Sequence, residues 1–355
     1  LNQYHHLPIA AEALFLKGRI QLDQGEEEKA AVAWLQALYE YPQAETAEGT
    51  KQRLFILLEK DWGDYTKEIT AIANHKAEGD TTSRLLSLIK QLYKIDDEKL
   101  DKALAELQLQ FLSRFPNYAY ADEVEILYAH NISTRSAKSG IFVFEKLLTL
   151  YPNSAYHAES LLATADLQAS LKRYDAAAKN YKKLIHDYPQ HKLVKRAYKS
   201  LATIQEKEQE DYVGAVQSLN NIVKLFPEDV MSLEALQTIA ELQAGKLKDP
   251  RSAIQSLRKI AKMFPSHEKE AIQALKDAAR IARRRLKDYT LYTQILQQVV
   301  SSFSKTDAAP RALYDLADFT ENKLKNRKDA QNYYLQLIRE YPKHKLAEKA
   351  RKRLE

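Results

Sequence analysis

Residues 186–198 read HDYPQHKLVKRAY, and the aromatic–proline pair near their start returns along the chain. A histidine again follows two residues after the proline in AKMFPSHEKEAI (261–272) and in IREYPKHKLAEKA (338–350). From Pro116 onward the pair, or Phe303–Ser304 in its place, recurs at steps of 36, 37, 38, 38, 39 and 38 residues. A fixed period of this length indicates a chain built from repeated structural units. The seven pairs are Tyr41–Pro42, Phe115–Pro116, Tyr151–Pro152, Tyr188–Pro189, Phe226–Pro227, Phe264–Pro265 and Tyr341–Pro342.

Each repeat reads as two helices. In residues 153–189 the stretch HAESLLATADLQAS places Leu161 and Ala165 on one helical stripe. The segment KRYD then turns the chain, and AAAKNYKKLIHDYP forms a second stripe with Tyr181 and Leu184. Proline ends the repeat because it cannot continue a helix and disfavours helical backbone angles in the residue before it.

The pattern predicts an all-α fold, an α–α superhelical solenoid of about nine helix pairs with a period of 36–39 residues. The whole chain, 1–355, is expected to form this single solenoid. A further helix over 343–355 has no second helix after it and is either a capping helix or a truncated one. The predicted repeats are approximately 8–42, 43–80, 81–116, 117–152, 153–189, 190–227, 228–265, 266–304 and 305–342.

The spacing inside each repeat resembles the tetratricopeptide repeat. That family has a small residue twelve positions before the proline, a bulky residue eight positions before it, and a small or apolar residue five positions before it. The small residue lets the two helices of a pair approach, and the bulky one fills the gap to the neighbouring helix. The matching residues are Ala30, Trp34 and Ala37; Ala177, Tyr181 and Leu184; Ala215, Leu219 and Ile222; Ala253, Leu257 and Ile260; and Ala330, Tyr334 and Leu337. In the other four repeats Glu68, Leu104, Gly140 and Tyr292 stand at the small position.

The resemblance implies a non-catalytic scaffold that binds other proteins. The long period and the ending YPNSAYHAESLL (151–162) look similar to bacterial cell-envelope members of the family, among them the outer-membrane barrel-assembly lipoprotein and the division coordinator of the Tol–Pal system. A periplasmic or outer-membrane-associated protein is therefore expected. Two alternatives stay open: the recognition arm of an envelope polysaccharide or peptidoglycan machine, and a cytoplasmic adaptor.

Composition limits the other classes of function. The net charge is +6, from 54 Lys and Arg against 48 Asp and Glu, which is too small for a dedicated nucleic-acid binder of 355 residues. No apolar run reaches the length of about 18 residues that a membrane span needs. The absence of cysteine rules out disulfides and thiolate metal sites and fits an oxidising compartment. The start at Leu1 suggests that a signal or lipid anchor preceded it.

Motifs for catalysis and cofactor binding are missing. The chain has no HExxH, no glycine-rich phosphate loop and no GxSxG, so neither an enzyme nor a cofactor is expected. Ser87–Lys90 matches the spacing SxxK, but the motifs that accompany it in enzymes are absent.

The recurrent histidines His191, His267 and His344 begin the first helices of alternate repeats, at a position that Ser154, Asp229 and Thr306 occupy in other repeats. Ser, Thr and Asp cap helices there. A shared metal would need its ligands within roughly 2 Å of one ion, so residues in different repeats cannot converge on it. We therefore expect a structural role for these histidines and no metal site.

The first helix of the eighth repeat carries the candidate binding residues. Within EKEAIQALKDAARIARRRLKDYT (268–290) a basic stripe runs along one helical flank, and an extra residue in the turn would bring it to the groove. Arginine forms forked hydrogen bonds to carboxylates, so the stripe predicts a partner with an acidic segment. Asp318 and Glu321 on the next first helix interrupt the positive charge and argue against nucleic acid. The candidate residues are Lys276, Arg280, Arg283, Arg284 and Lys287.

Overall fold

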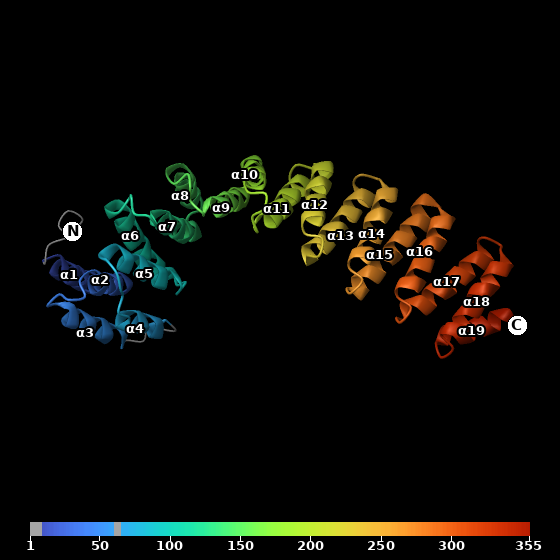
Figure 1. Cartoon of the computed structure of the whole chain (residues 1–355), viewed down its shortest axis with the longest axis horizontal. Helices are drawn as coiled ribbons and strands as arrows, with labels where there is room; N and C mark the ends of the chain where they lie inside the picture. Colours follow the sequence, from blue (N-terminus) through green and yellow to red (C-terminus); the bar gives the residue numbers. More distant parts are fainter. Residues whose placement is uncertain (1–8, 60–64) are drawn as a thin grey trace. The chain divides into compact units, whose positions relative to one another are not determined.

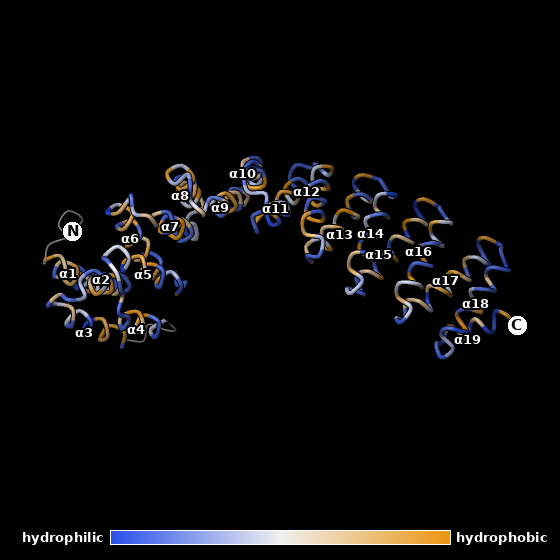
Figure 2. The backbone as a smooth tube through the Cα atoms, viewed as in Figure 1, coloured by the Kyte–Doolittle hydropathy of each residue, from blue (hydrophilic) through white to orange (hydrophobic). Residues whose placement is uncertain are grey.

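The computed structural model describes residues 9–59 and 65–355. Every regular element in these ranges is helical, and the helices follow one another as pairs joined by short turns (Figure 1). Hydrophobic and hydrophilic residues alternate along the turns of the helices (Figure 2). The predicted all-α fold is confirmed. No helix in the described ranges is both long and apolar enough to cross a membrane.

The chain divides into two compact units, residues 1–188 and 189–355. The N-terminal unit contains α1 (Ile9–Asp23), α2 (Glu27–Glu40), α3 (Ala47–Leu58), α4 (Thr66–Asn74), α5 (Thr81–Tyr93), α6 (Glu98–Arg114), α7 (Ala121–Arg135), α8 (Ala137–Leu150), α9 (His157–Ser170) and α10 (Tyr174–Asp187). The C-terminal unit contains α11 (Val194–Lys207), α12 (Tyr212–Leu225), α13 (Val230–Gly245), α14 (Pro250–Met263), α15 (Glu268–Ile281), the π-helical turn η1 (Ala282–Leu286), α16 (Tyr289–Ser302), α17 (Ala308–Asn322), α18 (Arg327–Glu340) and α19 (Lys345–Leu354).

These helices fall in pairs within the predicted repeats, of which residues 8 and 60–64 lie outside the described ranges. Because the chain divides into two units, one continuous solenoid over 1–355 stays a prediction. The last helix, α19, packs against α17 and α18 through the buried Ala347 and Ala350, and its other face is polar.

The pairs that match the family spacing have the interior that it predicts. Ala30, Ala177 and Ala253 have 0% of their surface exposed, and the bulky Trp34 and Tyr181 have 0% and 2% exposed. Gly140 takes the small position between α7 and α8, where an added Cβ would lie 2.9 Å from the Cα of Ser133. The two helices therefore cross too closely there even for alanine.

The second repeat departs from this register. Glu68 is exposed, and the adjacent Ile69 fills the interior with 0% exposure. Its helices α3 and α4 do not separate the first repeat from the third, because α2 packs directly against α5 and α6 as well as α3.

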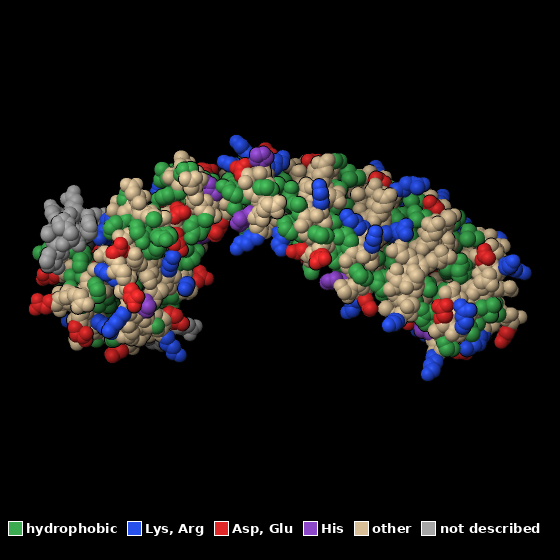
Figure 3. All heavy atoms as spheres, in the orientation of Figure 1, with side chains coloured by type: hydrophobic (Ala, Val, Ile, Leu, Met, Phe, Trp, Pro, Cys, Tyr) green, Lys and Arg blue, Asp and Glu red, His purple; other side chains and the backbone are tan. Residues whose placement is uncertain are grey.

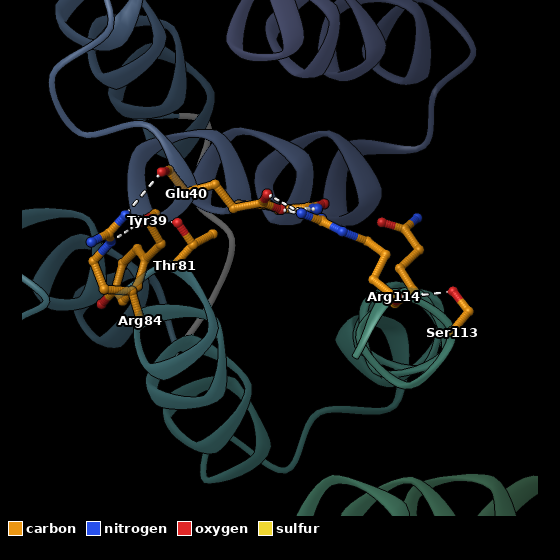
Figure 4. Close-up of polar contacts among 8 residues, drawn as sticks. Tyr39, Glu40, Thr81, Arg84, Ser113 and Arg114 are labelled. Atoms are coloured by element: carbon orange, nitrogen blue, oxygen red, sulfur yellow. Dashed lines mark hydrogen bonds and ion pairs between the residues drawn. The ribbon is translucent and has the colours of Figure 1, made fainter. Parts of the chain in front are cut away.

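A buried ion pair joins α2 to α6 (Figure 4). The Arg114 guanidinium donates to both carboxylate oxygens of Glu40, at 2.8 and 2.7 Å, and the two side chains are only 6% and 0% exposed. Gln36 donates a further hydrogen bond to Glu40 at 2.6 Å. Arg84 of α5 donates to the carbonyl oxygens of Tyr39 and Glu40, which lie in the last turn of α2. Arg84 thus provides hydrogen-bond donors for carbonyl groups that have no partner within the helix, because they lie in its last turn.

The turns inside the pairs share a backbone conformation. Among the described residues, six other than glycine have a positive φ, between 51° and 59°, and each follows the first helix of a pair. This left-handed conformation crowds the Cβ atom, so such positions favour glycine. The six residues are Asp96, Lys172, Glu210, Lys248, Lys287 and Lys325.

Replacing one of these residues with glycine should stabilise the fold. For Lys172→Gly we expect a gain of about 0.5–1 kcal/mol in the free energy of unfolding, because relief of the crowded Cβ outweighs the extra freedom of the unfolded chain. The matched control is Lys179→Gly, inside α10, which should lose about 1 kcal/mol. Urea denaturation measures the change in the free energy of unfolding for both variants. Changes of the same sign would contradict the expected relief of backbone crowding at Lys172.

The buried ion pair should behave as a unit. Arg114→Met strands the Glu40 carboxylate in the interior, and we expect a loss of about 3–5 kcal/mol. The double variant Glu40→Leu/Arg114→Met removes both charges and should lose less than the single variant. Urea unfolding followed by tryptophan fluorescence tests this, and a double variant less stable than Arg114→Met would contradict it.

Candidate partner-binding groove

Two hollows lie between successive first helices of the C-terminal unit. One, of about 200 Å³, lies between α11 and α13, and the other, of about 370 Å³, lies between α13 and α15. Their floors contain apolar residues that also belong to the core, such as Ala202, Ala240 and Ala274. We call the surface formed by these two hollows the groove.

Carboxylates outnumber cations in the groove. Its lining contains five carboxylates and three cations, and two pairs neutralise each other: Lys199 with Glu234 at 2.7 Å, and Arg280 with Asp277 at 2.5 Å. The groove therefore has a net negative charge. The other charged lining residues are Glu206, Glu241, Glu270 and Lys207.

The predicted basic stripe lies only partly in the groove. All five of its residues are exposed, but only Arg280 lines the groove, where Asp277 is its partner. Lys287 follows η1 with φ 54°, in the turn that joins α15 to α16, and Arg284 lies within η1 itself. The π-helical turn accommodates the extra residue that the eighth repeat was expected to contain, and it carries these two side chains into the turn between the helices.

Arg283 has an internal role. Its guanidinium lies 5.2 Å from the centre of the Phe319 ring and 5.7 Å from that of Tyr292, so it bridges α16 and α17. Asp315 lies nearby. Although its side chain is exposed, the surrounding protein removes enough water to raise the pKa of Asp315, with Asp318 adding to the rise, while Arg283 and Lys276 act against it.

The recurrent histidine position caps helices. The Nδ1 atom of His191 accepts a hydrogen bond from the backbone N–H of Leu193 at 3.3 Å, and His344 does the same for Leu346 at 3.2 Å. His267 instead lies edge-on against Phe264. The Ser154, Asp229 and Thr306 side chains also accept from the N–H two residues ahead. Among the described residues no cluster of three or more His, Asp or Glu could hold a metal ion.

Sequence reasoning missed the acidic side of the groove. Glu234, Thr238 and Glu241 follow one another on α13 at steps of four and three, the spacing of a single helix face. Applying the same test to α13 as to α15 would have revealed this polar stripe. The hollows themselves depend on how successive repeats pack, which the spacing of residues within one helix does not predict.

Family models of the tetratricopeptide repeat match residues 2–45, 159–191 and 311–344. The chain contains tetratricopeptide repeats. Proteins built from these repeats generally act as non-catalytic scaffolds that bind other proteins. No curated protein matches the sequence.

Solved structures with a similar arrangement of helices come from several bacteria. MamA from Desulfovibrio magneticus RS-1 is 16% identical, covers 53% of this chain and 97% of its own, and has a TM-score of 0.41. A tetratricopeptide repeat protein from Parabacteroides merdae is 11% identical, covers 75% and 96%, and has a TM-score of 0.41. The C-terminal part of a repeat protein from Cytophaga hutchinsonii is 10% identical, covers 74% and 98%, and has a TM-score of 0.42. Similarity at this level carries no argument about what this chain binds.

The two arginines at the centre of the stripe should differ in their effect on stability. Arg283→Ala removes the contacts with Phe319 and Tyr292, and we expect a loss of about 1 kcal/mol. Arg280→Ala removes an exposed ion pair and should cost less than about 0.5 kcal/mol. Thermal unfolding of both variants measures the difference. Equal losses would mean that the aromatic contacts of Arg283 add nothing.

Proposed function

We propose that the chain is a protein-interaction scaffold whose groove receives a segment of a partner protein. The observation that carries the proposal is the pair of adjoining hollows on successive first helices, lined by polar residues above an apolar floor. Successive repeats extend such a surface in one direction, which suits an extended or helical segment better than a small molecule.

The charge of the groove favours a partner segment that carries lysine or arginine. Glu206, Glu241 and Glu270 make no ion pair among the described residues, so a bound cation would gain a partner without breaking one. The acidic segment expected from the basic stripe is less well supported, because Arg280 already pairs with Asp277. Both versions keep the scaffold function and differ in the sign of the partner's charge.

We further propose a location in a bacterial cell envelope, in an assembly or transport complex. Support comes from the resemblance of residues 151–162 to envelope members of the repeat family and from the absence of cysteine. Fractionation of source cells tests it, since recovery of the protein in the cytoplasm would favour the adaptor alternative.

The test of the groove uses a photo-crosslinking amino acid in place of Gln237, which lines the larger hollow. A protein crosslinked there should be absent when the same group replaces Lys262, near the end of the second helix α14. We expect Glu241→Lys/Glu270→Lys to reduce the crosslinked species at least about tenfold, because each reversed charge turns attraction into repulsion.

The control variant is Glu208→Lys/Glu228→Lys, which makes the same change of charge at exposed positions outside the hollows. It should leave crosslinking unchanged. Equal loss in both variants would reject the groove, and loss on Arg280→Glu instead of Glu241→Lys/Glu270→Lys would show that the partner segment is acidic.

A further inference from the structure

A basic edge runs along one side of the C-terminal unit. We define it as residues 246–251, 284–287 and 323–328, in the three turns that join α13 to α14, α15 to α16 and α17 to α18. These sixteen residues include ten lysines and arginines and one carboxylate, Asp249. Figure 1 shows the three turns on the same side of the unit, and Figure 3 shows blue side chains along that upper edge.

Contacts between neighbouring helices hold the turns side by side. Arg285 donates a hydrogen bond to the carbonyl oxygen of Ala244, which links η1 to the end of α13. At the next turn the Lys323 ammonium lies 5.4 Å from the centre of the Tyr289 ring. Arg285 thus reaches the end of the neighbouring first helix, and with a Debye length of about 8 Å at physiological salt the charges of adjacent turns are screened from one another only in part.

The cations of the basic edge are exposed and none of them makes an ion pair within the described part of the chain. The carboxylate of Asp249 accepts the N–H of Ser252 as a helix cap, and Asp288, which follows Lys287 in the middle turn, accepts the N–H of Leu291 in the same way. The preceding turn, with Glu208, Glu210 and Asp211, is acidic, so the basic edge has a definite end. A local excess of positive charge of this size attracts an anionic surface from solution.

The three turns repeat one short pattern. Lys246-Leu-Lys248, Arg285-Leu-Lys287 and Lys323-Leu-Lys325 each place a leucine between two cations. Leu324 is 42% exposed at the tip of its turn. The last residue of each pattern has a positive φ, where glycine would cost less. The same position holds Asp96 and Glu210 in other pairs, so the turn itself does not require lysine there.

We propose that the basic edge binds the surface of a membrane rich in anionic lipid. Phosphate headgroups would contact the lysines and arginines of all three turns, and Leu324 would enter the headgroup layer. A nucleic acid fits less well, because single strands need open aromatic faces and those of Tyr212 and Tyr289 are covered by Lys246 and Lys323. The proposal uses residues outside the groove and does not depend on the proposed scaffold function.

The test is cosedimentation of the full chain with vesicles. We expect binding to vesicles of phosphatidylcholine that contain phosphatidylglycerol, no binding to phosphatidylcholine alone, and loss of binding at high salt. Lys248→Gln/Lys287→Gln/Lys325→Gln should lower the partition coefficient at least about tenfold, since each lysine near an anionic surface adds to the attraction.

A charge-matched variant separates this site from a general effect of net charge. Lys224→Gln/Lys262→Gln/Lys343→Gln removes three exposed lysines from the opposite ends of the helix pairs and should bind vesicles as the wild type does. Equal weakening in both variants, or no binding to the anionic vesicles, would overturn the proposal. Tighter binding to duplex DNA than to the vesicles would overturn it as well and assign the edge to nucleic acid.

Discussion

The close crossing of the two helices in each pair is the constraint on which the rest of the structure depends. It favours a small residue at one position, which Ala30, Ala177 and Ala253 fill with no exposed surface, although Leu104 and Tyr292 are buried at that position in two other pairs. Between α7 and α8 the crossing leaves no room even for the Cβ of alanine, and Gly140 stands there. Once the pair is closed, its turn must reverse the chain within a few residues, and a left-handed residue such as Lys172 makes this possible. Packing inside the pair thus fixes the turn, and stacking of pairs then places turns and first helices in rows.

The sequence was sufficient for the helix pairs but not for the surfaces they build. The repeat period and the positions of the prolines predict local features of the chain, namely where a helix ends and where a small residue is needed. Of the candidate stripe only Arg280 lines the hollow, and Arg284 and Lys287 lie in and just after the π-helical turn. Sequence spacing assumes a regular α-helix, and one extra residue in the helix breaks that assumption.

Other features depend on contacts between distant parts of the chain. The Glu40–Arg114 pair joins residues 74 positions apart, and it forms because the second repeat does not separate the first from the third. No spacing rule could have found it, since Arg114 ends α6 like any basic residue near a helix C-terminus. In the sequence, the glutamate at position 68 was the sign that the second repeat is irregular, because the family has a small residue there. In the structure Glu68 is exposed and the adjacent Ile69 is buried.

The C-terminal unit carries two surfaces of opposite sign, and under our two proposals they would take ligands of opposite charge. The groove, with Glu241 and Glu270, would repel phosphate groups, and the edge would repel a cationic partner segment. Glu241 and Lys246 are five residues apart on one helix, or about 7.5 Å of rise, which is close to the Debye length of about 8 Å at physiological salt. At that separation screening is only partial, so the carboxylates of the groove weaken the field of the edge at physiological salt and weaken it more at low salt.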